Sequence, residues 1–453
     1  MRIGIVGGGI GGLYVAYKLG YENYNVTLLE SQSKCGGRIQ TVYEKNGTIS
    51  YEAGPWRIPS SHKRAIALFK EFSVHLTPGM SKSPPGTKEK EMSGLTTWQV
   101  TALTQTPLRA DERDLQTGYA DQTHSASGSE PYMSRNSVFH VAPEGFSSLI
   151  EKITAAVVQK CTVLCSNKVV NLQRKNGEYV ATIRKRLGHN SFDTKTMQFD
   201  VIFLCVPPNN WKEWQCMKCA KSLQCAVEAG VLHHIYVSSV KPLPADEHFV
   251  DASLGNVVGP QYKSNWWQVS YSSGRIANMW HDYAMSNPKG FTERMQAAVD
   301  AFKGGTIEKL RRHYWPFAYH KWKAVPYFNL KQSVQKSVVP NSSLLPSFYC
   351  CGEAFSSHQA WIEGALETSE LALNAFRHGF YEHEVDGDFV VVEERKIDVT
   401  KFKFVHPGSR SALENHMREE VDDLMSHIGH SDKAWAIIHS LRPDISFLHL
   451  GCE

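Results

Sequence analysis

A short apolar segment that runs into a glycine cluster is the feature that most limits how this chain can fold. Residues 2–6 are mostly apolar and are followed at once by Gly7, Gly9 and Gly12, which fit the spacing G-x-G-x-x-G. Residues 10–19 then have helical spacing. This order predicts a buried parallel strand, a tight turn and a helix.

Each glycine has a distinct role in such a turn. Gly7 permits the turn itself, Gly9 lets the backbone approach a pyrophosphate, and Gly12 lets the helix pack closely on the strand. A second strand is predicted at residues 25–29, and Glu30 ends it, where a carboxylate can accept ribose hydroxyls. The helix N-terminus offers free N–H groups to phosphates. The pattern predicts a dinucleotide site without deciding between NAD and FAD.

Composition narrows the class of protein. The chain has 453 residues, 42% of them hydrophobic, which suits two or three domains. A net charge of +4 without a basic run gives no reason to expect nucleic acid as a partner. The sequence has no apolar stretch of about 18 residues, so we expect no membrane span. Because the first predicted strand leaves no room for a signal peptide, we expect an intracellular, cytoplasmic protein.

Coarse secondary structure follows from local patterns along the rest of the chain. Residues 80–135 are polar and predict a loop-rich insertion, and residues 162–183 predict a hairpin around an Asn-Gly pair. Residues 201–206 are apolar and predict another buried strand. We expect amphipathic helix over 285–313 and a strand, turn and helix over 348–376.

Two more segments carry a resemblance to a known family. Residues 35–38 read Cys-Gly-Gly-Arg, and residues 349–353 and 360–365 contain further glycines and acids. These segments resemble those of the flavin-containing amine oxidase family. The resemblance implies FAD, and because no cysteine suited to a covalent flavin link lies near Tyr327, we expect the FAD to be held without one. It also implies that Glu353 contacts the ribityl chain and that the following helix points its N-terminus at the flavin.

The family resemblance implies a set of cofactor-binding residues. The residues expected to contact FAD are Gly7, Gly9, Gly12, Glu30, Gly37, Arg38, Gly54, Pro55, Trp56, Arg57, Val169, Gly352, Glu353, Trp361 and Ile362. Val169 takes the place of a residue that contacts adenine, and a valine in an ordinary strand is the alternative interpretation.

The resemblance also implies a fold class and domain boundaries. We expect an α/β protein in which a Rossmann-like FAD-binding domain is interleaved with an α+β substrate domain, together forming a module over 1–385. The FAD-binding parts are expected at about 1–70, 140–210 and 340–380, and the substrate-binding parts at about 71–139 and 211–339.

Arg57 points to the substrate class. The stretch 52–59 looks like the corresponding stretch of L-amino-acid oxidases, in which the arginine at the Arg57 position binds the substrate carboxylate. A guanidinium binds a carboxylate through two parallel hydrogen bonds that lysine cannot reproduce. The alternative is that Arg57 contacts an FAD phosphate or a neighbouring acid.

Three further residues are candidates for the catalytic site. Trp361 and Tyr327 match aromatic residues that line the flavin face in the family, although a core tryptophan is the alternative for Trp361. His234 stands where the family commonly has a lysine that holds a water near flavin N5. A histidine can hold such a water or act as a base. Because a histidine replaces this lysine, the resemblance does not decide whether oxygen reoxidises the flavin quickly.

The C-terminal residues 388–453 resemble cytochrome b5, a small α+β haem-binding domain. His406 lies in a His-Pro-Gly segment, and His430 follows at the separation that this family uses. The resemblance implies that the two histidines bind the iron of haem b from opposite faces, which leaves no open coordination position and suits electron transfer. A domain that keeps the fold without the haem is the alternative.

These patterns lead to one preferred function and two alternatives. We expect oxidative deamination of an L-amino acid by hydride transfer to flavin N5, with electrons passed to oxygen or through the haem to a redox partner. One alternative is a polyamine or monoamine oxidase, or a desaturase of the same superfamily. The other is a catalytically inactive flavin-binding scaffold.

Overall fold

The computed structural model describes residues 1–78, 88–89, 138–187, 191–244, 248–251, 253–323, 330–340, 344–378, 389–392 and 395–398. Most of the polar segment 80–135 and nearly all of the tail 388–453 therefore lie outside the described residues. Within the described part of the chain, no helix is both long and apolar enough to cross a membrane.

A five-stranded parallel sheet forms the first layer. Its strand order is β19-β13-β1-β2-β9, and every neighbouring pair is parallel. The strands are β1 (Arg2–Val6), β2 (Asn25–Leu29), β9 (Thr162–Leu164), β13 (Val201–Leu204) and β19 (Phe348–Cys350). The first two strands match the expectation. Burial on both faces explains their apolar sequences, since the neighbours Ile5 and Val6 point to opposite faces and are both buried.

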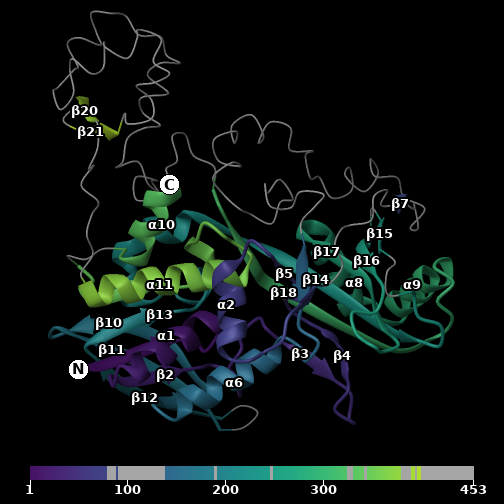
Figure 1. Ribbon diagram of the computed structural model, residues 1–453, viewed down its shortest axis with the longest axis horizontal. Coiled ribbons are helices and arrows are strands. Elements are labelled where there is room, and N and C mark those ends of the chain that lie inside the picture. The colour runs from purple at the N-terminus through teal and green to yellow at the C-terminus, as the bar shows by residue number, and fades with distance from the viewer. Residues whose placement is uncertain are drawn as a thin grey trace, which may run out of the picture.

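Helices cover this sheet and form its core contacts. The main ones are α1 (Ile10–Tyr21), α6 (Ser147–Val158) and α11 (Ile362–His378), and α1 packs against both of the others. Figure 1 shows α11 and α1 beside the parallel strands. The helix expected after the first glycine cluster and the strand, turn and helix expected near the end of the module are both present.

A six-stranded sheet forms the second layer. Its order is β18-β14-β17-β16-β15-β7, antiparallel except for the pair β15–β7. Its strands are β7 (Lys88–Glu89), β14 (Val227–Ser239), β15 (His248–Asp251), β16 (Gly255–Val258), β17 (Trp266–Ser273) and β18 (Ile307–Trp322). Helices α8 (Gly274–Ser286) and α9 (Pro288–Ala301) pack on it.

The expectation of helix over 285–313 is partly wrong. The residues of α9 are helical, but β18 begins at Ile307. The strand pairs with β14 along its length, including the pairs Leu310 with Val237 and Trp322 with Val227. Such long-range pairing decides strand formation where the local pattern is ambiguous.

Smaller elements complete the description. The strands β10 (Asn167–Lys175), β11 (Glu178–Arg186) and β12 (Phe192–Phe199) form an antiparallel sheet. The turn expected between the first two has positive φ at Asn176 (52°) and Gly177 (86°), as a tight hairpin requires. The remaining elements are β3 (Thr41–Tyr43), β4 (Ile49–Glu52), β5 (Ile58–Pro59), β6 (Thr77–Pro78), β8 (Phe139–Val141), β20 (Phe389–Val392), β21 (Arg395–Asp398), α2 (Lys63–Glu71), α7 (Lys221–Cys225), α10 (Leu330–Val338), and the 3-10 turns η2 (Pro208–Asn210), η3 (Gln215–Ala220) and η4 (Glu353–Phe355).

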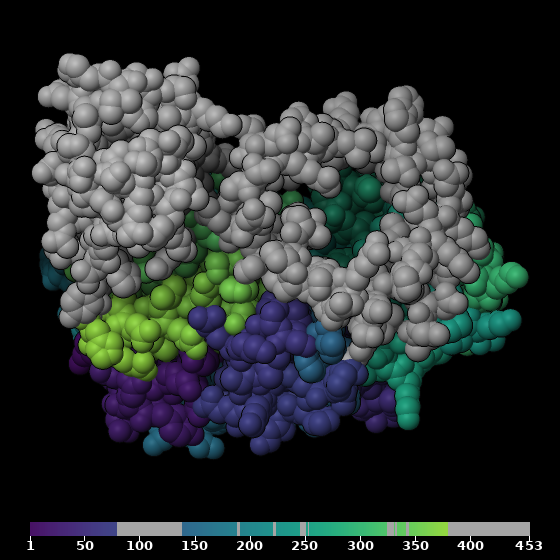
Figure 2. All heavy atoms as spheres, turned by 45° about the horizontal axis from the view of Figure 1, so that its top comes forward, coloured from purple at the N-terminus to yellow at the C-terminus, as the bar shows by residue number. Residues whose placement is uncertain are grey.

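The two layers meet where β18 ends. The backbone N–H of Trp322 donates to Gln359 Oε1 over 2.9 Å, and its indole N–H donates to the carbonyl of Ser356 over 3.0 Å. In Figure 2 the yellow-green residues of α11 lie next to the purple N-terminal part at the left. The teal residues of the larger sheet lie at the right. The segment 353–360 therefore joins the two layers.

Candidate cofactor and substrate site

The first glycine turn leaves space at one position and none at another. Gly7 has φ +104°, and its N–H donates to the carbonyl of Leu29 over 2.8 Å. A Cβ on Gly12 would lie 1.9 Å from the Gly7 oxygen, whereas a Cβ on Gly9 would meet nothing within 4 Å. The helix is thus packed tightly on the strand at Gly12, and the face of Gly9 is open to a ligand.

Glu30 closes the same turn from the end of β2. Its side chain is buried, and Oε2 accepts from the Gly8 N–H over 2.7 Å. Oε1 accepts from the Gln32 N–H over 2.7 Å and from the Ser31 hydroxyl over 3.1 Å. Because each carboxylate oxygen has two lone pairs, Oε2 can accept one more hydrogen bond, whereas both lone pairs of Oε1 are used.

The segment 36–38 lies directly against this turn. The Gly36 N–H donates to the Gly8 carbonyl over 2.8 Å. Gly37 has φ +58°, and a Cβ there would lie 3.2 Å from the Cα of Gly9. The backbone of Gly54 approaches the backbone of Arg38 even more closely, because a Cβ on Gly54 would lie 1.9 Å from the Arg38 oxygen. Gly37 therefore packs against Gly9, and Arg38, the next residue in the chain, lies close to the open face of Gly9.

Arg38, Glu353 and His320 form a cluster beyond the glycine turn, in which Glu353 and His320 are buried and Arg38 is partly exposed. Arg38 Nη1 donates to Glu353 Oε1 over 2.6 Å and to the carbonyl of Ala318 over 2.8 Å. His320 Nδ1 lies 2.7 Å from the same Oε1. Burial favours a raised pKa for Glu353, but the Arg38 charge and the His320 contact outweigh it and hold the pKa well below its usual range. The carboxyl group is therefore ionised.

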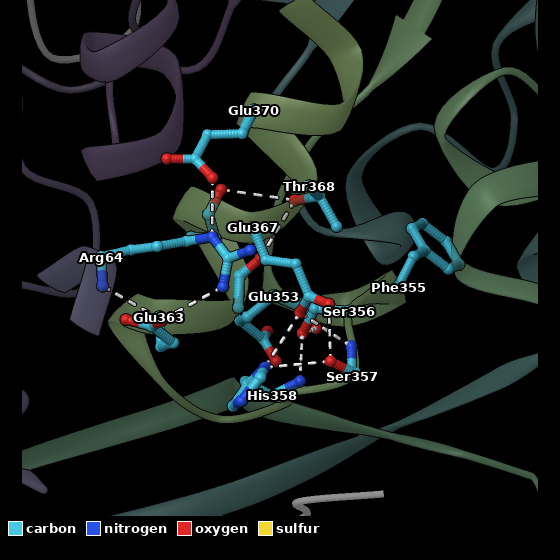
Figure 3. A network of polar contacts seen from close by, with 12 residues as sticks. Arg64, Glu353, Phe355, Ser356, Ser357, His358, Glu363, Glu367, Thr368 and Glu370 are labelled. Atoms are coloured by element: carbon cyan, nitrogen blue, oxygen red, sulfur yellow. Dashed lines mark hydrogen bonds and ion pairs between the residues drawn. The ribbon is translucent and has the colours of Figure 1, made fainter. Parts of the chain in front are cut away.

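The loop after Glu353 is held by its own polar network (Figure 3). Gly352 has φ +126°, and the Ala360 N–H donates to Glu353 Oε2 over 2.9 Å. Glu367 accepts from the Ser357 hydroxyl over 2.5 Å and lies 3.1 Å from His358 Nδ1. These bonds fix the approach to α11, whose first residue is the expected contact residue Ile362.

Arg57 lies among aromatic side chains. Its guanidinium carbon lies 4.9 Å from the ring centroid of Trp56 and 4.4 Å from that of Phe139. Burial lowers its pKa, and Tyr271 opposes the shift. Within the part of the chain that the structure describes, no carboxylate forms an ion pair with Arg57. A partly buried guanidinium of this kind is suited to an anionic ligand.

His234 contacts Tyr271, the residue whose electrostatic effect opposes the pKa shift of Arg57. It sits on β14 opposite Tyr271 and His313, and its ring meets that of Tyr271 edge-on at 4.5 Å. Burial, together with His313 and His233, lowers the pKa of His234 to about 3. The imidazole is therefore neutral at physiological pH and can hold a water, but its low pKa makes it a weak base.

Trp361 and Val169 differ in their surroundings. Trp361 is half-buried and meets His62 edge-on at 5.0 Å, and its indole N–H has no hydrogen-bond partner among the described residues. Val169 is buried in β10 and belongs to the core cluster that contains Leu29. Val169 therefore fits either interpretation, strand core or cofactor contact. Pro55, another expected contact residue, lies partly exposed between Gly54 and Trp56.

Three predicted residues lie outside the described residues: Tyr327, His406 and His430. Within the described ranges, no group of three or more His, Cys, Asp or Glu side chains can hold a metal ion. Conversely, sequence reasoning missed His320 and Tyr271. A signal for His320 existed, because it stands shortly before Tyr327, which the resemblance placed at the flavin face.

The fold and the glycine turn define a protein with a Rossmann-like dinucleotide-binding domain. Residues 5–72 match the family model described as the NAD(P)-binding Rossmann-like domain. Over most of the chain, two solved oxidase structures share the fold. One is a putative protoporphyrinogen oxidase from Exiguobacterium sp. 255-15, with a TM-score of 0.56 and 14% identity over 83% of this chain and 98% of that one. The other is a putrescine oxidase variant redesigned for cofactor binding, with a TM-score of 0.57 and 11% identity over 82% and 97%.

Sequence similarity points to particular relatives. A stretch of 76 residues is 38% identical to an L-amino acid oxidase of Bothrops pictus, which is 17% of this chain and 15% of that protein. An L-amino-acid oxidase of Demansia vestigiata is 35% identical over 75 residues, or 17% of this chain and 14% of the relative. The matched stretch therefore covers only a small part of either protein.

Proposed function

We propose that this chain is an FAD-dependent oxidoreductase that oxidises an amine, with oxidative deamination of an L-amino acid as its reaction. Three observations support the cofactor: the open face of Gly9, the adjoining segment 36–38, and a fold shared with oxidases. The sequence similarity to L-amino-acid oxidases supports the substrate class.

The surroundings of Arg57 are the main support for an amino acid as the substrate. It is held between two aromatic rings and lacks a carboxylate partner among the described residues. A substrate carboxylate would supply that partner, whereas an amine without a carboxylate would leave the guanidinium unpaired.

The other candidate residues bind and orient. FAD, when bound, supplies the hydride acceptor. In the proposed site Arg57 holds the substrate carboxylate, and Trp361 together with Tyr327 excludes water from the flavin face. His234, neutral because of its low pKa, holds a water close to the reacting amine.

Anaerobic bleaching of the flavin absorbance tests the proposal. The purified holoenzyme is mixed with L-phenylalanine and, separately, with phenethylamine, which differs only in lacking the carboxylate. We expect the amino acid to bleach the flavin and the Arg57→Leu variant to lower the second-order rate constant of flavin reduction about a hundredfold. Equal bleaching by both compounds would instead support an amine oxidase. A flavin that no amine in a broad panel bleaches would support the inactive scaffold.

We also propose that the tail binds haem b through His406 and His430 and receives electrons from the flavin. The support is the sequence resemblance alone, and oxygen is the competing acceptor. A Soret band that forms on haem addition and is lost in the His406→Ala variant is the expected result. A full-length protein without a Soret band after haem addition would rule out the haem.

A further inference from the structure

The cluster behind Arg38 contains a histidine to which neither the sequence motifs nor the proposed reaction gives a role. His320 lies near the end of β18 and is 1% exposed. Its Nδ1 lies 2.7 Å from Glu353 Oε1, and its backbone N–H donates to Glu353 Oε2 over 3.3 Å. One residue therefore contacts both oxygens of the carboxylate. The Glu353 side chain is also buried, at 4% exposure, so its carboxylate is enclosed by protein partners.

Arg38 is the member of the cluster that can reach a ligand. Its side chain is 32% exposed, against 4% for Glu353. Both contacts to described residues, with Glu353 and Ala318, use Nη1, so Nε and Nη2 have no partner among the described residues. A guanidinium presents five N–H donors in a planar fork, and fixing one nitrogen fixes the direction of the others.

The position of Arg38 indicates what the remaining donors face. Gly37, the preceding residue, lies against Gly9, whose face is open. Glu353 follows β19, and β19, β13 and β1 are adjacent parallel strands that end at the same edge. Ligands of such sheets bind at this carboxyl edge, with the diphosphate at the glycine turn.

We propose that His320 is a positioning residue that orients the Glu353 carboxylate, which in turn aims the free donors of Arg38 at the diphosphate of the bound dinucleotide. This inference rests on the proposed cofactor, FAD, but not on the proposed substrate. His320 donates through Nδ1–H, so the proposal requires the tautomer that carries its proton there.

A double-mutant cycle on FAD affinity tests the proposal. FAD is titrated into the full-length apoprotein, and binding is followed by flavin fluorescence without any amine present. We expect His320→Leu and Arg38→Leu each to weaken binding about tenfold and the double variant to be no weaker than Arg38→Leu alone. His320→Asn keeps an N–H donor at the Nδ1 position, so it should restore affinity to within about threefold of wild type.

Controls separate this role from general destabilisation. His281→Phe changes a histidine of α8 that stacks on Tyr314 outside the cluster, and it should leave FAD affinity unchanged. If His320→Leu does not fold, His320→Gln, whose amide lies one atom farther out, replaces it in the cycle.

Additive losses, wild-type affinity in the Leu or Gln variant, or failure of His320→Asn to restore binding would each overturn the proposal. Since no substrate is present, a protein that binds FAD as expected but oxidises no amino acid would refute only the proposed reaction.

Discussion

Arg38 Nη1 lies 2.6 Å from Glu353 Oε1, although the two residues are 315 positions apart in the chain. The contact joins the segment after the first glycine turn to the loop after β19. Since Glu353 is buried and ionised, its partners compensate a charge that burial would otherwise disfavour.

Neutralising this carboxylate should destabilise the protein. We expect Glu353→Gln to lower the free energy of unfolding by about 3 kcal/mol, because the Arg38 charge loses its partner. Urea denaturation of the apoprotein measures the change. Glu71→Gln is a matched control at a more exposed ion pair, Lys18–Glu71 at 3.1 Å, and should cost less than about 1 kcal/mol. Equal losses in the two variants would contradict the account.

Two alanine substitutions in the glycine turn should have opposite consequences. Gly9→Ala adds a methyl group to open space, so stability should change by no more than about 1 kcal/mol while FAD affinity falls at least about tenfold. Gly12→Ala places a Cβ against the Gly7 oxygen and should lower the free energy of unfolding by about 3 kcal/mol. Thermal melting and FAD titration distinguish them. A Gly9→Ala protein with unchanged FAD affinity would show that the open face is not used.

Local sequence patterns predicted the elements that carry the glycines. Short apolar runs and helical spacing identify β1, α1 and β2, and the Asn-Gly pair identifies the hairpin at 176–177, because these patterns depend on neighbours in the chain. The beginning of β18 was assigned to helix, since its state depends on pairing with β14. The role of His320 was missed for the same reason: its partner is 33 positions away in another layer.

Histidine burial predicts a pH dependence of stability. Burial, together with neighbouring charged groups, lowers the pKa values of His233 and His234 to about 3 from an ordinary value of 6.5. Between these values the unfolded chain binds protons that the native state does not, so stability falls as the pH drops from 6.5 towards 3. His234→Gln removes one such group. The slope of unfolding free energy against pH, measured by urea denaturation from pH 6 to pH 4, should decrease by up to about 1.4 kcal/mol per pH unit. An unchanged slope would mean that His234 is protonated in the native state.

Glu363 joins two helices, and its charge should stabilise both. It lies in the first turn of α11 and accepts from the Ala65 N–H over 2.9 Å and the Arg64 N–H over 3.2 Å at the start of α2 (Figure 3). A buried carboxylate near two helix N-termini binds free N–H groups and complements both dipoles. We expect Glu363→Gln to cost about 2 kcal/mol of unfolding free energy.

Glu370 supplies the matched comparison for Glu363. It also pairs with Arg64, at 2.7 Å from Nε, but its side chain is 37% exposed. Solvent screens such a pair, so Glu370→Gln should cost less than about 1 kcal/mol in the same denaturation experiment. If Glu370→Gln proved the more damaging change, the Arg64 ion pair rather than the helix cap would connect α2 to α11. The two variants share one arginine but differ in burial and in the backbone N–H contacts, so a larger loss for Glu363→Gln measures the combined contribution of the cap and of burial.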